Sequence, residues 1–71
     1  MARQQLFEFM HDGNRINVYT GESSSDVYYS VNGGSSRGAG IRFNESQGNF
    51  KSGSGGTLSH DEAKSRIRNQ I

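Results

Sequence analysis

Three short segments in the first half of the chain alternate between apolar and polar residues, which is typical of half-buried β-strands. The segments are Leu6–His11, Arg15–Thr20 and Val27–Val31, and residues 21–26 form a polar loop before the third. Asp12-Gly13-Asn14 lies between the first two segments, and these residue types tolerate the positive φ angles of a tight hairpin turn. The pattern therefore predicts an antiparallel meander in which the three strands are neighbours.

The alternation also predicts which residues lie opposite each other. A turn at Asp12-Gly13 pairs Leu6 with Tyr19, and folding back the third segment pairs Tyr19 with Tyr28. A slip by one residue would move every side chain to the other face of the sheet, so the agreement of three segments supports this register. One face then has the composition of a core, and it contains Phe7, Phe9, Ile16, Val18, Tyr29 and Val31.

The opposite face of the predicted sheet is more apolar and aromatic than solvent exposure requires. Tyrosine is enriched at protein interfaces because it combines a large contact area with a polar tip. A simpler alternative is that the tyrosines form only a stabilising cross-strand pair. We predict a partner-binding surface on this face, consisting of Leu6, Met10, Arg15, Tyr19, Tyr28 and Arg42.

A fourth strand is predicted over Gly40–Asn44, after a glycine-rich connection. Pairing it with the third strand places Ile41 opposite Val31 on the core face, because alternate residues share a face. Arg42 then lies on the other face of the sheet. Gln47–Lys51 is a candidate for a fifth, short strand.

The carboxy-terminal segment predicts one helix. Residues 52–56 have the composition of a flexible Gly/Ser linker. Ser59 is followed three residues later by Glu62, which is the spacing of a capping box at a helix start. We expect the helix to cover the core face of the sheet with a stripe of apolar residues four apart, namely Ala63, Ile67 and Ile71.

These elements predict an α+β fold, an antiparallel β-meander of three to five strands with one C-terminal α-helix packed on one face. We expect a single small domain over residues 1–71, with strands within about 5–51, a linker at 52–57 and a helix over about 59–71. Hydrophobic residues make up 30% of the 71 residues and the mean hydropathy is −0.85, so the core is thin.

The composition limits how so small a chain is stabilised and where it acts. Chains of this size often need a disulfide, a metal or association. This chain has no cysteine and only two histidines, which leaves association with a partner or a second copy, and a homodimer is an expectation. The lack of cysteine, of a membrane-spanning apolar run and of an apolar signal-peptide stretch favours a cytoplasmic protein without a membrane partner.

The sequence contains no recognisable constellation for catalysis, for a cofactor or for a metal. His11 and His60 have no convergent partners at ligand or acid–base spacing. The glycine runs do not continue into a phosphate-binding fingerprint. We therefore expect a protein that is not an enzyme and that has no catalytic, cofactor-binding or metal-binding residues.

Two functions remain for the predicted surface. The first is a small protein-binding module, such as an inhibitor or adaptor of the kind that phages and mobile elements carry, which docks its aromatic sheet face on a protein partner or on itself. The alternative is nucleic-acid binding, in which Tyr19 and Tyr28 stack bases. The phosphates would then be held by Arg15, Arg42, Lys51 and the helix arginines Arg66 and Arg68. The net charge of +1 is far from the basic excess of a dedicated DNA-binding protein, which favours the first function.

Overall fold

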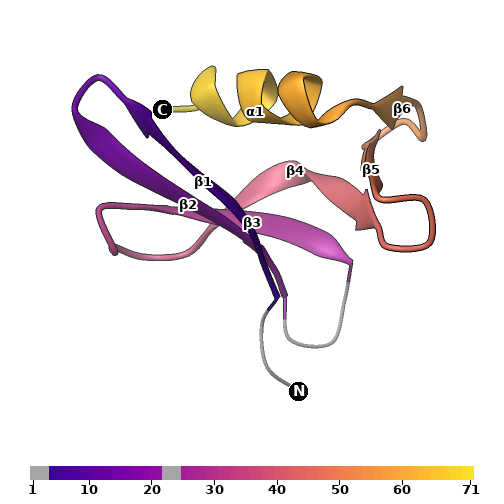
Figure 1. The fold of residues 1–71 in the computed structure, drawn as a ribbon, viewed down its shortest axis with the longest axis horizontal. Helices are drawn as coiled ribbons and strands as arrows, with labels where there is room; N and C mark the ends of the chain where they lie inside the picture. Colours follow the sequence, from indigo (N-terminus) through magenta and orange to yellow (C-terminus); the bar gives the residue numbers. More distant parts are fainter. Residues whose placement is uncertain (1–3, 22–24) are drawn as a thin grey trace.

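The computed structural model of the chain describes residues 4–21 and 25–71. Within this part, six strands form one curled antiparallel sheet in sequence order, followed by a short helix (Figure 1). The predicted α+β class is confirmed, although the sheet has six strands and not three to five. The middle of the predicted loop, residues 22–24, lies outside the described residues. The elements are β1 (Gln5–His11), β2 (Asn14–Thr20), β3 (Asp26–Val31), β4 (Arg37–Asn44), β5 (Asn49–Ser52), β6 (Thr57–Leu58) and α1 (His60–Arg68).

The first three strands pair largely as the sequence predicts. The turn between β1 and β2 has φ of 51° at Asp12 and 80° at Gly13, which are the positive angles that a two-residue hairpin turn needs. This turn sets the register of the first hairpin, and the polar alternation extends it to β3. The predicted cross-strand pairs that the structure contains are Phe7–Val18, Phe9–Ile16, Val18–Tyr29, Ile16–Val31 and Tyr19–Tyr28.

The predicted pairing of Leu6 with Tyr19 is wrong. Gln5 lies opposite Tyr19, and the register shifts between Gln5 and Phe7, so that Leu6 is the extra residue of a β-bulge. The Leu6 side chain is half-buried and packs against the hydrophobic core. A bulge releases its extra residue from the strict alternation of the strand, which explains why the sequence pattern placed Leu6 on the opposite face.

The predicted register of the fourth strand is also wrong, although its faces are right. Tyr28 lies opposite Gly38, and Asp26 lies opposite Arg42, with a shift in register between these two pairs. Val31 is therefore not the partner of Ile41, because β4 begins earlier than predicted. Since the displacement is by an even number of residues, Ile41 stays on the core face and is 3% exposed.

The predicted Gly/Ser linker is a tight hairpin turn that joins β5 to β6. The Ser52 N–H donates to the Gly56 carbonyl oxygen at 2.7 Å, and the Gly56 N–H donates to Ser52 Oγ at 3.0 Å. Lys51 lies opposite Thr57 in the short ladder that follows. The glycines of this segment form a turn between two paired strands. The composition of the segment does not distinguish such a turn from a flexible linker, and this is why the sequence predicted a linker.

The helix begins as predicted and ends early. The Glu62 N–H donates to Ser59 Oγ at 3.2 Å, and the Ser59 N–H donates to Glu62 Oε1 at 3.1 Å, so both bonds of the capping box are present. Ala63 and Ile67 are fully buried. Ile71 lies beyond the last helical turn and is 41% exposed, so its predicted place in the apolar stripe is wrong.

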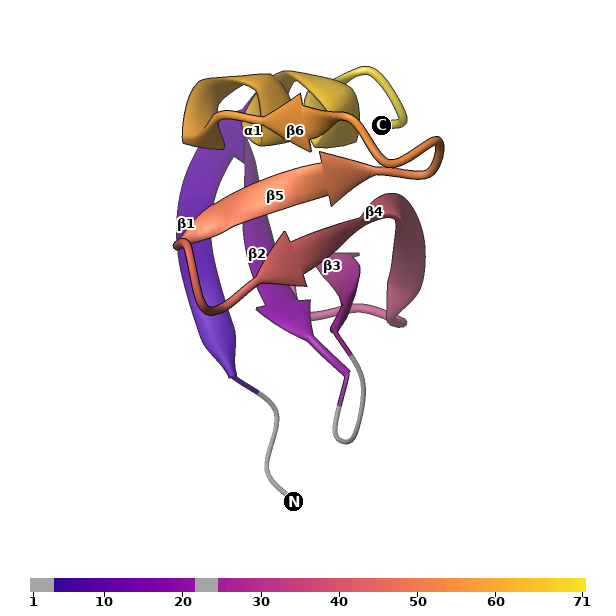
Figure 2. The ribbon, with the colours of Figure 1, turned by 90° about the vertical axis from the view of Figure 1, so that its right-hand side faces the viewer.

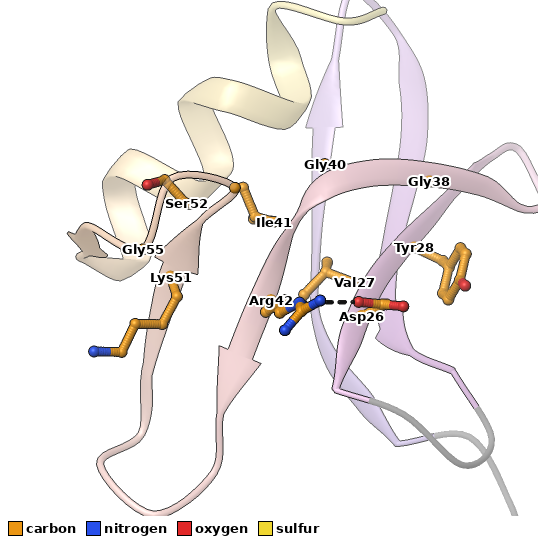
Figure 3. Close-up of a pocket in the computed structure, with 11 residues that line it drawn as sticks. Asp26, Val27, Tyr28, Gly38, Gly40, Ile41, Arg42, Lys51, Ser52 and Gly55 are labelled. Carbon is orange, nitrogen blue, oxygen red and sulfur yellow. Dashed lines mark ion pairs between the residues drawn. The ribbon is translucent and has the colours of Figure 1, made fainter.

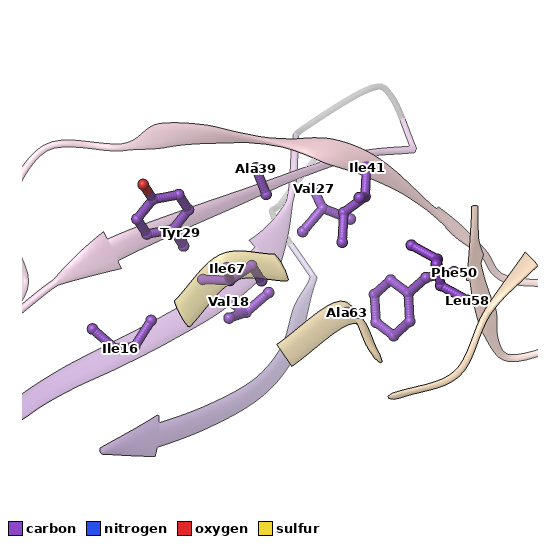
Figure 4. Packing of buried hydrophobic residues seen from close by; sticks show 10 residues of the cluster. All are labelled: Ile16, Val18, Val27, Tyr29, Ala39, Ile41, Phe50, Leu58, Ala63 and Ile67. Atoms are coloured by element: carbon purple, nitrogen blue, oxygen red, sulfur yellow. The ribbon is translucent and has the colours of Figure 1, made fainter. Parts of the chain in front are cut away.

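The core lies between the helix and one face of the sheet (Figure 4). The amino-terminal half of α1 reaches β1, where the His60 ring lies 4.3 Å from the Phe7 ring and Lys64 Nζ lies 5.6 Å from the Phe9 ring centre. Among the described residues, no helix has the length and apolar character needed to cross a membrane. The buried residues of the core cluster are Ile16, Val18, Val27, Tyr29, Ala39, Ile41, Phe50, Leu58, Ala63 and Ile67.

Candidate functional site

The side of the sheet that faces away from α1 is the candidate site, and we call it the outer face. Strand alternation places one row of polar residues across β1, β2 and β3, where Glu8 lies opposite Asn17 and Asn17 lies opposite Ser30. A second row contains Tyr19 and Tyr28. The outer face consists of Glu8, Met10, Arg15, Asn17, Tyr19, Asp26, Tyr28, Ser30, Gly38, Gly40, Arg42 and Lys51.

The two tyrosines stack, but they differ in accessibility. Their ring centres are 6.5 Å apart with an angle of 26° between the planes. Tyr19 is only 6% exposed, and its hydroxyl is hydrogen-bonded to Ser36 Oγ in the segment that follows β3. Tyr28 is half-buried. The outer face therefore presents one accessible tyrosine ring and not the exposed pair that the sequence predicted.

A hollow of about 590 Å³ lies between β3 and β5, across β4 (Figure 3). Gly38 and Gly40 contribute only backbone to its lining, and a Cβ built at either position would meet no atom within 4 Å. Tyr28 borders the hollow from β3, and Arg42 and Lys51 border it from β4 and β5. We call it the Tyr28 hollow. It combines an aromatic ring, two cations and accessible backbone.

The cations of the Tyr28 hollow have polar partners that orient them. Arg42 Nε lies 3.4 Å from Asp26 Oδ1, and both side chains are at least half exposed. Lys51 Nζ donates to Thr57 Oγ1 at 3.4 Å. Exposed pairs of this kind contribute about 0–1 kcal/mol to stability, so they leave the cations available to a partner.

A second hollow of about 530 Å³ lies over β1 and β2, and we call it the Met10 hollow. Met10 is 64% exposed, and Arg15 lies opposite it. Asn17 and Ser30 also line this hollow. Asn17 Oδ1 is buried and has no hydrogen-bond partner within the part of the chain that the structure describes. Buried polar atoms in folded proteins nearly always have a hydrogen-bond partner, so this unpaired acceptor requires an explanation.

The six predicted surface residues are thus distributed among four environments. Tyr28 and Arg42 line the Tyr28 hollow, and Met10 and Arg15 line the Met10 hollow. Tyr19 is buried between them, and Leu6 packs on the core side. Sequence reasoning missed the contributions of Asp26, Asn17, Gly38 and Gly40, because the β3–β4 register that brings most of them together has no local signal.

The described residues contain no group of three or more His, Asp or Glu side chains placed to hold a metal ion. His11 Nε2 lies 3.4 Å from the carboxylate of its neighbour Asp12, and His60 packs against Phe7 and Phe50. Each histidine therefore contacts neighbouring side chains of the fold. No protein-family model, curated protein or solved structure matches the chain.

Proposed function

We propose that the chain is a non-enzymatic protein-binding module that docks its outer face on a protein partner. The observation that carries the proposal is that α1 covers only the core face, while the outer face presents two hollows lined by apolar, aromatic and charged groups. Protein interfaces combine such groups, with aromatic and arginine side chains as anchors and a polar rim around them. Tyr28 and Arg42 are the anchors on this surface.

A protein partner fits this surface better than a nucleic acid does. Proteins that bind single strands stack bases on exposed rings, but the Tyr19 ring is buried, which leaves Tyr28 alone. The charges of the outer face are also nearly balanced, since Glu8 and Asp26 offset two of its three cations. Mixed charge favours a partner surface of complementary pattern over a phosphate backbone.

The proposal includes the mode of action. A module of this size acts by occupying a surface of its partner, as an inhibitor or an adaptor does, and it needs no chemistry of its own. The lack of cysteine agrees with a cytoplasmic setting, where thiols are kept reduced. Cell fractionation with an antibody against the chain tests that location.

The decisive experiment uses the chain as bait and compares two double variants. Tyr28→Ala with Arg42→Ala removes both anchors of the Tyr28 hollow. Arg66→Ala with Arg68→Ala is the matched control, since it removes two exposed side chains from the helix, which covers the other face. We expect a partner that the wild type and the control retain and the first variant loses. Equal retention by all three chains would refute the role of the outer face.

A second measurement separates the protein partner from the nucleic-acid alternative. Fluorescence anisotropy with labelled single- and double-stranded oligonucleotides is recorded at low and near-physiological salt. We expect no saturable binding at near-physiological salt. Micromolar binding that weakens steeply with salt and disappears in Arg15→Ala and Arg42→Ala would overturn the proposal in favour of nucleic-acid recognition.

A further inference from the structure

The β1 strand lies at one edge of the sheet and has a strand neighbour on one side only, within the part of the chain that the structure describes. Figure 2 shows β1 along the left margin of the molecule. The opposite edge is β6, which has only two residues, whereas β1 has seven. An edge strand presents unpaired N–H and C=O groups that are a template for pairing with another chain. The longer edge, β1, is therefore the one suited to such pairing.

The hydrogen bonds of β2 identify which backbone groups of β1 point outward. The Thr20 N–H donates to the Gln4 carbonyl at 2.9 Å, and the Asn32 N–H donates to the Arg15 carbonyl at 2.8 Å. Even-numbered residues of β2 thus bond toward β1, and odd-numbered ones bond toward β3, because the direction alternates along an antiparallel strand.

The same alternation applies to the residues of β1 that lie opposite. Phe9 lies opposite the even-numbered Ile16, so its backbone groups bond to β2. Glu8 and Met10 lie opposite odd-numbered residues of β2, so their N–H and C=O groups point to the free edge. The regular part of β1 beyond the bulge at Leu6 therefore offers two residues with outward donors and acceptors.

We infer that a second copy of this chain pairs with the free edge of β1, antiparallel and with the two-fold axis at Phe9. In this register the Glu8 of each copy lies opposite Met10 of the other copy. These two pairs contain the four outward N–H groups and the four outward carbonyls that the two copies provide. The two Phe9 residues face each other as a non-hydrogen-bonded pair, which agrees with their bonding to β2. The result is a continuous sheet through both copies.

Charge selects this register from the neighbouring ones. A two-fold axis at Glu8 would place the two Glu8 carboxylates directly opposite each other. An axis at Met10 would bring Glu8 to the end of the other copy's strand, beside the carboxylate of Asp12 in its turn. Like charges directly opposite are destabilising. An axis nearer the amino end meets the bulge at Leu6, which interrupts the ladder. Only the axis at Phe9 avoids both problems.

The exposure of Met10 supports the same arrangement. It is 64% exposed, the largest exposed fraction among the large hydrophobic residues that the structure describes. The pairing places its side chain beside the aliphatic part of Glu8. The thin core of the chain also makes added apolar burial valuable. This interface uses the edge of β1, so it is independent of docking through the Tyr28 hollow.

The test is sedimentation equilibrium over a concentration range from about 10 μM to about 1 mM, in which the wild type is expected to show a monomer–dimer equilibrium. Met10→Glu places a carboxylate opposite Glu8 in both symmetry-related pairs and is expected to weaken the dimer on the order of fivefold. Met10→Lys is the matched control, because it removes the same side chain but places a cation opposite Glu8, and its dimer is expected to be at least as tight as that of the wild type. The double variant Glu8→Lys with Met10→Glu restores the opposite charges and is expected to restore the dimer.

Three outcomes would overturn the inference. They are a monomer at every concentration, a dimer that the Glu and Lys variants of Met10 weaken equally, and a dimer that the double variant fails to restore. Circular dichroism of each variant verifies that it is folded, which is expected because both substituted side chains are exposed. The Tyr28→Ala with Arg42→Ala variant is expected to dimerise like the wild type, so failure of docking through the Tyr28 hollow would leave this result unaffected.

Discussion

Ile67 is the principal attachment of the helix to the sheet, and its truncation is the sharpest test of the fold. The helix has nine residues, which is too short to be stable in isolation, and only Ala63 and Ile67 within it are buried. Ile67 is fully buried within the core cluster (Figure 4). The packing of this one side chain therefore decides whether the helix stays on the sheet.

The magnitude of Ile67→Ala follows from the atoms removed. Loss of three buried carbon atoms at roughly 0.8 kcal/mol each is about 2.4 kcal/mol. The cavity left behind brings the expected loss to about 3–4 kcal/mol, within the usual range for such substitutions. A chain of 71 residues has a total stability of roughly 4–11 kcal/mol. The substitution is thus expected to remove roughly a quarter or more of the free energy of unfolding.

Urea unfolding followed by circular dichroism measures this loss. With a denaturant dependence of about 1 kcal/mol per molar urea, the unfolding midpoint is expected to fall by about 3 M. Ile71→Ala is the matched control, because the same truncation at an exposed position outside the helix is expected to change stability by less than about 0.5 kcal/mol. A loss below about 1 kcal/mol for Ile67→Ala, or equal losses for the two variants, would refute the packing described here.

Three further predictions concern single contacts, and urea unfolding measures each of them. Gly40 has φ of 76°, so Gly40→Ala is expected to lower the free energy of unfolding by about 1–2 kcal/mol. Gly38 has an ordinary φ and open space around it, so Gly38→Ala is expected to be nearly neutral. Equal effects of the two substitutions would contradict the backbone conformation at Gly40. Ser59→Ala removes the helix cap and is expected to cost about 1 kcal/mol, and no loss would show that the capping box contributes nothing. Tyr19→Phe removes the hydroxyl bond to Ser36 and is expected to cost about 0.5–1.5 kcal/mol, and an unchanged midpoint would mean that this bond does not form in solution.

Local signals determined much of this protein. Asp12 and Gly13 accept the positive φ angles of a hairpin turn, and that turn alone sets the register of β1 on β2. Ser59 and Glu62 are three residues apart and form a capping box, so a segment of four residues determines where the helix begins. The alternation of apolar residues placed Ile41 on the core face even though its expected partner was wrong. Each of these features depends on residues that are close together in the chain.

The candidate site depended instead on contacts between distant segments. The Tyr28 hollow forms because Gly38 lies opposite Tyr28. That register depends on the shape of the connection between β3 and β4. Connections of several different lengths would keep the same residues on the core face, so the alternation alone does not select one register. Tyr19 is buried, and its hydroxyl is hydrogen-bonded to Ser36, which is seventeen residues away in the chain.

The β-bulge at Leu6 and the hairpin at residues 53–56 follow the same principle. A bulge changes the face of a side chain by the insertion of one residue, and a glycine-rich segment becomes a turn only when the strands on its two sides find each other. The sequence by itself therefore determined the first four strands, the faces of most of their residues, the first hairpin and the start of the helix. Only the tertiary structure decided which outer-face residues share a hollow, because periodicity specifies a side of the sheet and carries no information about position along it.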